Sequence, residues 1–273
     1  MPLPPNLVSI ALSRVANPEA LAPLLQSKGL ERLFLWAGGA ELRDLPQNGL
    51  PGLREFLLQN DALDDEGLSR LARCPRLEAL YISGNRITDG GLAAIRNAQF
   101  LHTIELRDTE IGDAACETLL TLPALHCLDL PGTRVTEHGA ARLAKAPNLQ
   151  SLALDGRQVT PLSMHALAQL PSLIELYLYG TEVTTASIEL AAGLPRLIEL
   201  NLNNVKLDAA AVAAIARMST LRVVRLSGHG PADFATALRA ARPELVILGG
   251  LAPQQVADGS HRPNPGRVQL RNT

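Results

Sequence analysis

Residues 77–95, LEALYISGNRITDGGLAAI, contain two periodicities that together specify one structural unit. Leu80 and Ile82 alternate with outward-facing neighbours, which is the pattern of a short strand with one buried face. The pair Gly84-Asn85 then predicts a turn, and Thr88-Asp89 is typical of a helix start. Apolar residues at helical spacing follow. The unit therefore reads strand, turn and helix.

This unit recurs along the chain with a period of 24 residues. Its first leucine stands at Leu53, Leu77, Leu101, Leu125, Leu149, Leu173, Leu197, Leu221 and Leu245. Two earlier copies begin at Leu7 and Leu30, with a spacing of 23. One unit cannot bury its own apolar face, so neighbouring units must stack their strands in parallel. We therefore predict an α/β, right-handed solenoid shaped like a horseshoe, with a concave parallel β-sheet and outer helices.

Some units depart from the pattern. The ninth position is polar in most units, but Arg157, Val205 and His229 replace the small polar residue. We expect locally irregular turns there. The first two units lack the TDxG helix signal, so we expect shorter 3₁₀ or extended crossovers in them.

The strings LYISGNRITDGGLAAI and LYLYGTEVTTASIELAAGLP resemble the leucine-rich repeat family, in its ribonuclease-inhibitor-like and bacterial 24-residue forms. Those forms follow the pattern LxxLxLxxTxVTDxGLxxLAxLPx. The resemblance extends from residue 7 to about residue 250. It implies a horseshoe fold and a scaffold that binds other macromolecules, and it names no partner.

The repeat pattern also predicts the domain organisation. We expect an N-terminal segment at 1–6, a repeat domain at 7–250 and a tail at 251–273. Within the repeat domain we expect two variant repeats at 7–52, regular repeats at 53–244 and a partial last strand at 245–250. The tail has three prolines and a net charge of +2, and its composition predicts disorder.

Composition argues against several classes of function. A formal charge of -2 without a Lys/Arg cluster gives no general attraction to nucleic acid or anionic membranes. Three cysteines without CxxC spacing favour reduced thiols. The apolar run near the N-terminus is interrupted at Arg14, and no stretch approaches spanning length. We expect a monomeric, cytoplasmic protein, and non-Sec delivery as an effector stays open.

The sequence offers little for chemistry. It contains no GxxxxGK[ST], GxGxxG, GxSxG or HExxH motif, so we predict no enzyme, no catalytic residue and no cofactor. His102 and His126 occupy equivalent positions in adjacent units, with Cys127 next along the chain, and could supply two metal ligands. Equivalent neighbours arise by chance in any repeat array, so we predict no metal site. Ordinary histidines near Glu105 and Asp129 are the simpler interpretation.

A row of acidic residues begins the helices of successive units, namely Asp65, Asp89, Asp113 and Glu137. Carboxylates are favoured at helix N-termini, so we interpret this row as structural.

The outward strand positions form the candidate binding surface. The residues that we expect to contact a partner are Tyr81, Glu105, Arg107, Asp129, Asp155, Glu175, Tyr177, Tyr179, Glu199, Asn201 and Asn203, with Phe34 and Trp36 near the N-terminal end. Exposed tyrosines among polar residues resemble the composition of protein interfaces. The hypothesis is a scaffold that binds a protein or peptide, with tyrosines as anchors and carboxylates that steer a basic partner.

Glu105 and Asp129 occupy equivalent positions on neighbouring strands, about 5 Å apart, where like charges repel. A basic partner would relieve that repulsion. Alternatively, Arg107, His102 and His126 neutralise the carboxylates within the chain.

A second class of function is a host-directed bacterial effector or a ubiquitin-ligase adaptor. Residues 3–25 look somewhat like an F-box, and GAARLAKAP at 139–147 resembles GALA-type effectors. The same N-terminal residues fit the repeat equally well. If they are a repeat, Leu7, Ile10 and Leu12 align with Leu30, Leu33 and Leu35 on a strand.

Overall fold

The computed structural model describes residues 7–13, 22–36, 45–59, 63–180, 182–227 and 232–249. In this part of the chain eleven strands form one parallel sheet, ordered as in the sequence from β1 to β11. They are β1 (Ser9–Ser13), β2 (Arg32–Trp36), β3 (Glu55–Gln59), β4 (Ala79–Tyr81), β5 (Thr103–Glu105), β6 (Cys127–Asp129), β7 (Ser151–Asp155), β8 (Glu175–Tyr179), β9 (Glu199–Asn203), β10 (Val223–Ser227) and β11 (Val246–Leu248). The predicted α/β solenoid is confirmed.

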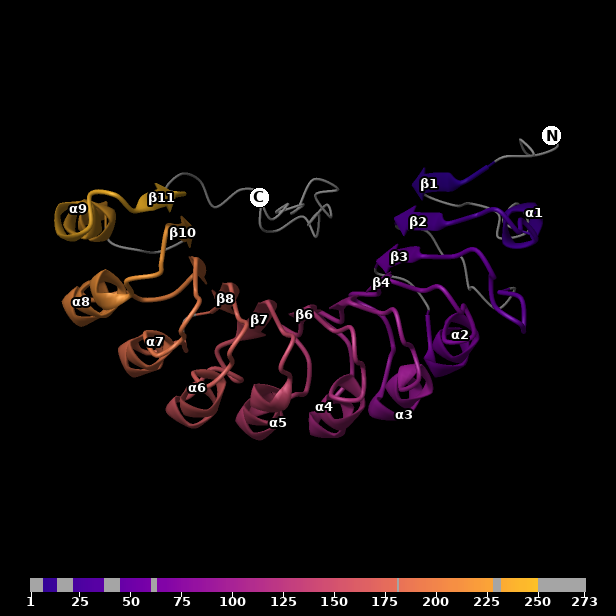
Figure 1. Ribbon diagram of the computed structural model, residues 1–273, viewed down its shortest axis with the longest axis horizontal. Coiled ribbons are helices and arrows are strands. Elements are labelled where there is room, and N and C mark those ends of the chain that lie inside the picture. The colour runs from indigo at the N-terminus through magenta and orange to yellow at the C-terminus, as the bar shows by residue number, and fades with distance from the viewer. Residues whose placement is uncertain are drawn as a thin grey trace.

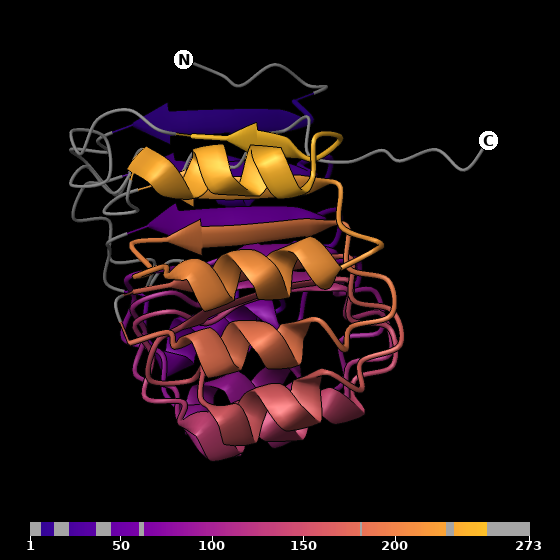
Figure 2. The ribbon, with the colours of Figure 1, turned by 90° about the vertical axis from the view of Figure 1, so that its left-hand side faces the viewer.

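Helices return the chain from strand to strand, except between β2 and β3, where the described residues contain bends and turns. The described ones are α1 (Ala22–Leu25), α2 (Asp65–Leu71), α3 (Asp89–Leu92), α4 (Asp113–Leu119), α5 (Glu137–Arg142), α6 (Pro161–Leu167), α7 (Thr185–Ala191), α8 (Ala209–Arg217) and α9 (Ala232–Ala241), with 3₁₀ turns η3 (Ala93–Ile95) and η4 (Leu143–Lys145). Figure 1 shows an arc with the strands on its inner side and the helices on its outer side. Figure 2 shows the helices of successive C-terminal units stacked one above another. The first crossover contains the short helix α1, so the expectation of a purely 3₁₀ or extended crossover was wrong there.

The strand register follows the repeat except at the C-terminal end. Ile10 pairs with Leu33 and Leu12 with Leu35, as the repeat interpretation of the N-terminus requires. Residues 1–6 and 14–21, which contain most of the F-box-like stretch, lie outside the described residues. At the other end Val224 pairs with Ile247, a spacing of 23 and not the predicted 24. Ile247 therefore takes the inward position that the 24-residue period assigned to Leu248, which is 39% exposed.

The core lies between the two layers and is built mainly from leucine, with isoleucine, valine and alanine beside it. Inward residues of consecutive strands, such as Leu128, Leu152 and Leu176, are no more than 1% exposed. Burying a leucine side chain contributes roughly 1.5–3 kcal/mol, so the stacked columns supply most of the driving force for folding. Phe56 is the largest fully buried side chain, which fits the low aromatic content of the chain.

The turns after the strands repeat a left-handed backbone position. Gly84, Gly132 and Gly180 have positive φ, and Asp108 and Asn204 adopt it in the units between and after them. Gly132 has a φ of 74°, and an added Cβ would lie 1.9 Å from Asp108 Oδ1, so a larger residue would be strained and would displace the Asp108 carboxylate.

The ninth residue of the unit satisfies the backbone inside these turns. Asn85 is 2% exposed. Its amide nitrogen donates to the carbonyls of Leu58 and Ile82, both at 2.9 Å. Where Arg157 replaces this residue, the neighbouring Gln158 is buried and donates to the carbonyl of Leu130 at 3.0 Å. The irregular turn predicted at Arg157 is thus a shift of the buried amide by one residue, whereas His229 lies outside the described residues.

The acidic row at the helix starts links each unit to the next. Asp65 accepts hydrogen bonds from the Thr88 backbone N–H at 2.9 Å and from its hydroxyl at 2.6 Å. Asp113 accepts the same pair from Thr136, both at 2.7 Å. Asp89 accepts from the Gly112 N–H at 2.6 Å. The row therefore does more than complement the helix dipole, because its carboxylates also tie together the N-terminal ends of successive helices.

Candidate protein-binding face

The inner surface of the arc, which we call the concave face, is formed by the strand residues that point away from the leucine core. The register places these residues in columns across the sheet. One column runs through Tyr81, Glu105 and Asp129, and another pairs Asp155 with Tyr179. The strands thus bring the predicted partner-binding residues together on one surface. The side chain of Asn203 lies outside the described side chains, although its backbone pairs with Tyr179.

Two of the residues expected to be exposed are buried. Tyr177 is 4% exposed and Asn201 is 7% exposed. The expectation of an open Tyr177 anchor was therefore wrong. Tyr177 pairs with Asn201 in the register, and its hydroxyl donates to Glu175 at 3.1 Å and to Glu199 at 3.3 Å. The curved sheet packs these outward side chains against one another, which strand alternation alone does not predict.

The central carboxylates of the concave face have internal partners. Arg107 forms an ion pair with Asp129 at 3.1 Å. Asp155 accepts a hydrogen bond from the Gly132 N–H at 2.8 Å and lies 3.6 Å from the Arg157 guanidinium. The alternative in which Arg107 neutralises the carboxylates within the chain is thus supported at Asp129. His102 and His126 do not take part in the hydrogen bonds found for this carboxylate in the described part of the chain.

Arg107 also reaches across the sheet to a tyrosine. Its guanidinium carbon lies 4.6 Å from the centre of the Tyr179 ring. Arg107 lies in the loop after β5, whereas Tyr179 is the last residue of β8. This cation–π contact adds to the ion pair with Asp129. Burial lowers the pKa of Arg107, but Asp129 and Tyr179 outweigh it, so the pKa is raised overall. A carboxylate and an aromatic ring of the concave face therefore hold the Arg107 guanidinium together.

A second group of interacting side chains lies on β8, β9 and β10. We call Glu175, Tyr177, Glu199, Asn201 and Arg225 the polar cluster. Arg225 approaches Glu199 at 2.5 Å through Nε and at 3.5 Å through a terminal nitrogen. Glu175 accepts hydrogen bonds from the hydroxyls of Ser151, at 3.0 Å, and Tyr177. The cluster contains two carboxylates and one guanidinium, so its formal charge is negative.

The N-terminal quarter of the concave face is more apolar. Phe34, Leu57 and Tyr81 are equivalent residues on β2, β3 and β4. The rings of Phe34 and Trp36 lie 5.9 Å apart. Burial, together with Glu105 and Glu55, raises the pKa of the Tyr81 hydroxyl, so it is a neutral hydrogen-bond donor at physiological pH. This end offers aromatic surface, whereas the other end offers charge.

The two histidines that could supply metal ligands lie near each other in the structure. The rings of His102 and His126 lie 6.3 Å apart in an edge-to-face arrangement. His102 Nδ1 lies 3.0 Å from the Thr103 hydroxyl, and His126 Nδ1 contacts the Ala124 carbonyl. Burial raises the pKa of the Cys127 thiol to about 12, which makes it a poor ligand and nucleophile. Among the described residues, no group of three or more His, Cys, Asp or Glu side chains could hold a metal ion.

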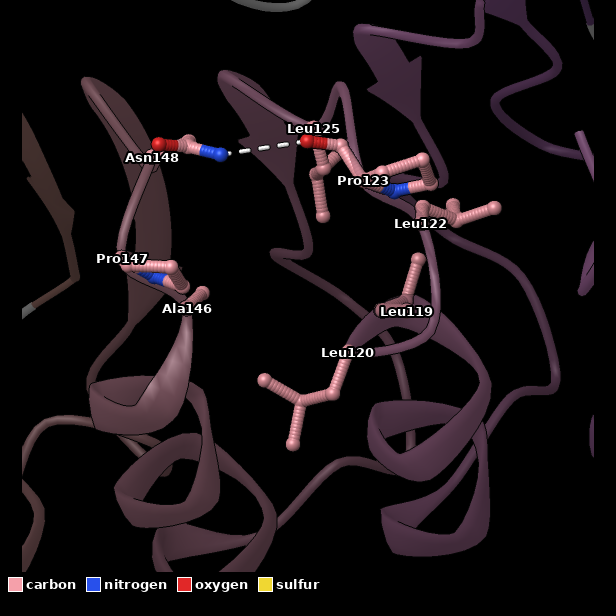
Figure 3. Close-up of a pocket in the computed structure, with 8 residues that line it drawn as sticks. All are labelled: Leu119, Leu120, Leu122, Pro123, Leu125, Ala146, Pro147 and Asn148. Atoms are coloured by element: carbon pink, nitrogen blue, oxygen red, sulfur yellow. Dashed lines mark hydrogen bonds between the residues drawn. The ribbon is translucent and has the colours of Figure 1, made fainter. Parts of the chain in front are cut away.

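A hollow lies between two neighbouring units where the chain passes from helix to strand (Figure 3). Its lining residues are Leu119, Leu120, Leu122, Pro123, Leu125, Ala146, Pro147 and Asn148. Asn148 Nδ2 donates to the Pro123 carbonyl at 3.1 Å across its rim. The lining consists of repeat-forming residues at the end of α4 and in the loops that follow α4 and η4, so the hollow is a gap in the stacking of two units. It holds no titratable side chain.

Sequence reasoning missed two basic residues of the concave region. Arg225 stands 24 residues after Asn201 in the same column, so the period itself could have included it. Arg157 lies in the turn after β7, and its pairing with Asp155 follows from the irregular turn. The 24-residue spacing from Asn201 would have predicted the position of Arg225 on the concave face. No such spacing predicts the position of Arg157.

Comparisons with known proteins agree with this architecture. Residues 73–95 match a family model described as Leucine Rich repeat, and these residues include β4, α3 and η3. No curated protein matches the chain. Within the described residues, no helix has both the length and the apolar character needed to cross a membrane.

Proposed function

We propose that this chain, a leucine-rich repeat protein, is a scaffold that binds a protein partner on its concave face. The observation that carries the proposal is the open surface of the eleven-stranded sheet, on which aromatic and charged side chains stand in columns. Leucine-rich repeats are interaction modules, and the concave location is our inference. A surface built on strands is held in place before binding, which lowers the entropy that association costs.

The aromatic side chains are suited to anchor a partner. Tyr179 is the tyrosine of β8 that is not buried, and Tyr81 stands on β4 near the aromatic N-terminal end. Aromatic residues at the centre of an interface carry a large share of the binding energy. Because Tyr177 is buried, we assign the anchor role on β8 to Tyr179 alone.

The charge of the concave face favours a basic partner. The described outward strand positions, together with Arg107 in the loop after β5, carry six carboxylates against three guanidinium groups. The carboxylates are Glu55, Glu105, Asp129, Asp155, Glu175 and Glu199, and the guanidinium groups belong to Arg32, Arg107 and Arg225. Internal pairing reduces the repulsion among them but leaves an acidic excess. Such an excess raises association rates with basic partners, and this effect weakens as salt is added.

We propose a binding role without catalysis. The thiols of Cys116 and Cys127 have pKa values raised by burial to about 12, so neither supplies a thiolate near neutral pH. Most charged side chains of the concave face pair with one another, as Arg107 does with Asp129 and Arg225 does with Glu199. These observations support a surface that recognises a partner and performs no reaction on it.

Site-specific photocrosslinking tests the proposal. A benzophenone amino acid placed at Tyr179 in the full chain, expressed in its native cells, should capture a protein. The same group at Leu162, which is 51% exposed on α6, is the matched outer position. The captured protein is then purified, and its affinity is measured for the wild type, Tyr179→Ala and Leu162→Ala. We expect Tyr179→Ala to cost about 2 kcal/mol in binding and Leu162→Ala almost nothing. A partner that is captured at position 162 and weakened only by Leu162→Ala would place the binding surface on the helices.

A further inference from the structure

Asn201 carries an unmet hydrogen-bonding group on the concave face. Its neighbours in the strand, Leu200 and Leu202, point into the core, so the Asn201 side chain points to the concave side. The residue is only 7% exposed, yet its Oδ1 atom is buried and accepts no hydrogen bond in the described part of the chain. Buried acceptors are nearly always paired, so an unpaired one requires an explanation, and a donor supplied by a ligand is one such explanation.

The surroundings of Asn201 determine what kind of donor it would take. Tyr177 is its register partner on β8, and the Tyr177 hydroxyl lies between the carboxylates of Glu175 and Glu199. Arg225 is its register partner on β10 and pairs with Glu199. In the described residues Glu175 accepts hydrogen bonds from neutral hydroxyls and has no ion-pair partner. The cluster therefore combines an unmet acceptor with an excess of negative charge.

We propose that the polar cluster is a binding site for an arginine side chain presented by the protein partner. This inference rests on the proposed function and assigns the chemistry of one part of the binding surface. Asn201 Oδ1 accepts one hydrogen bond from the guanidinium, and the carboxylate of Glu175 pairs with its charge. A guanidinium is planar and offers five donors, so it can serve both acceptors at once.

Two arginines of the chain already display this mode of recognition on the same face. Arg107 is held by the carboxylate of Asp129 and the ring of Tyr179. Arg225 lies against Glu199 with its side chain 43% exposed. A lysine ammonium is a compact, strongly hydrated charge and lacks the planar fork, so arginine fits the separated acceptors better.

Arg225 is the internal competitor of the incoming arginine. Asn201 Oδ1 is closed to solvent, so a ligand reaches it only when a neighbouring side chain moves. Arg225 is the partly exposed member of the cluster and can turn outward. Among the described residues, removing it would leave Glu199, like Glu175, without an ion-pair partner. The Arg225→Met variant should therefore bind an external guanidinium more tightly, while Asn201→Leu should bind it more weakly.

A small probe tests the site without knowledge of the partner. The full chain, labelled with ¹⁵N, is titrated with Nα-acetyl-arginine amide while the side-chain amide signal of Asn201 is followed. Nα-acetyl-citrulline amide is the neutral control of the same shape. We expect a saturable shift with the arginine probe, with a dissociation constant on the order of millimolar, and no saturation with citrulline. Equal responses to both probes, or no response at Asn201, would overturn the proposal.

Three variants separate the site from general charge effects. Asn201→Leu should weaken the probe about tenfold, Arg225→Met should tighten it several-fold, and Asn97→Leu on the exposed outer surface should leave it unchanged. Asn201→Leu replaces an unmet acceptor by an apolar group of similar size, so it should fold. A loss of binding in Asn97→Leu equal to that in Asn201→Leu would contradict the assignment.

A displayed library of random 12-residue peptides distinguishes this inference from the proposed function. Peptides selected on the full chain should require an arginine in the wild type and lose that requirement in Asn201→Leu. Peptides that compete at Tyr179 but need no arginine would overturn the inference and leave the proposed function standing. Peptides that ignore the concave face would count against both. The chain's own tail would be the occupant if peptides were selected only on a variant in which Arg262, Arg267 and Arg271 are changed to glutamine. That result would also overturn the inference that the site binds an arginine of the partner.

Discussion

The two surfaces of this solenoid are built on the same 24-residue period and use it differently. At the helix starts the same interaction recurs from unit to unit, with Asp65 bonded to Thr88 and Asp113 bonded to Thr136. On the concave face the equivalent column changes at every strand, from Tyr81 through Asp129 to Asn201. What repeats along the chain holds the units together. What varies along the chain is free to recognise a partner.

The sharpest way to break this comparison is to remove a repeated core residue. Leu152 is 0% exposed between Leu128 and Leu176. Leu152→Ala leaves a cavity that its neighbours fill only in part, so we expect a loss of about 3 kcal/mol in the free energy of unfolding. Urea unfolding followed by circular dichroism measures it. The control Tyr179→Ala, on the concave face, should cost under about 1 kcal/mol. Equal losses in both variants would mean that the two surfaces are not distinct.

The same substitution, asparagine to leucine, can be compared at a turn residue and at a residue of the concave face. Asn85 lies in a turn that recurs in the units, and its side-chain amide donates hydrogen bonds to three backbone carbonyls. Asn201 lies on the concave face, and its Oδ1 atom accepts no hydrogen bond in the described part of the chain. Asn85→Leu strands the backbone groups it satisfies and should cost about 2 kcal/mol of stability. Asn201→Leu should cost nothing and can raise stability by up to about 1 kcal/mol. Thermal unfolding of the two variants side by side checks the opposite signs, and a large loss in Asn201→Leu would assign that residue a structural role.

The carboxylates of the helix starts should contribute a smaller amount each. Asp113 accepts two hydrogen bonds from Thr136 at 2.7 Å. Asp113→Ala should therefore lower the free energy of unfolding by about 1 kcal/mol, as loss of a helix cap does. Glu117→Ala on the same helix is the control, because the Glu117 side chain is 68% exposed and lies 3.6 Å from Arg142. Denaturant midpoints compare the two, and a control loss as large as that of Asp113→Ala would remove the special role of the row.

The smallest effect concerns pH. Burial lowers the pKa of His102, so the folded chain favours the neutral imidazole more than the unfolded chain does. The stability that depends on this group is present above the unfolded pKa of about 6.5 and is lost as pH falls through it. Between about pH 7.5 and 5 the wild type should therefore lose stability relative to His102→Gln. Urea midpoints measured for both at several pH values would contradict this if their difference stayed constant.

The sequence predicted what the period controls and failed where individual side chains decide. The inward leucines, the helix starts and the N-terminal register follow from spacing, and each was predicted correctly. The register of β11 was wrong because the crossover between β10 and β11 is one residue shorter than the 24-residue period assumes. The burial of Tyr177 and Asn201 was missed because it depends on how long side chains pack across a curved sheet. The contact of Arg107 with Tyr179 was missed for the same reason, since it joins residues three units apart.

The central claim is that the variable concave face, and not the repeated outer face, contacts the partner. Hydroxyl-radical footprinting of the full chain, alone and with its purified partner, reports the exposure of individual side chains on both faces. We predict that oxidation of Tyr81 and Tyr179 falls on binding, while that of Leu162 and of Phe100, which is 58% exposed, stays unchanged. Protection of Leu162 or Phe100 with unaltered oxidation of both tyrosines would contradict the claim.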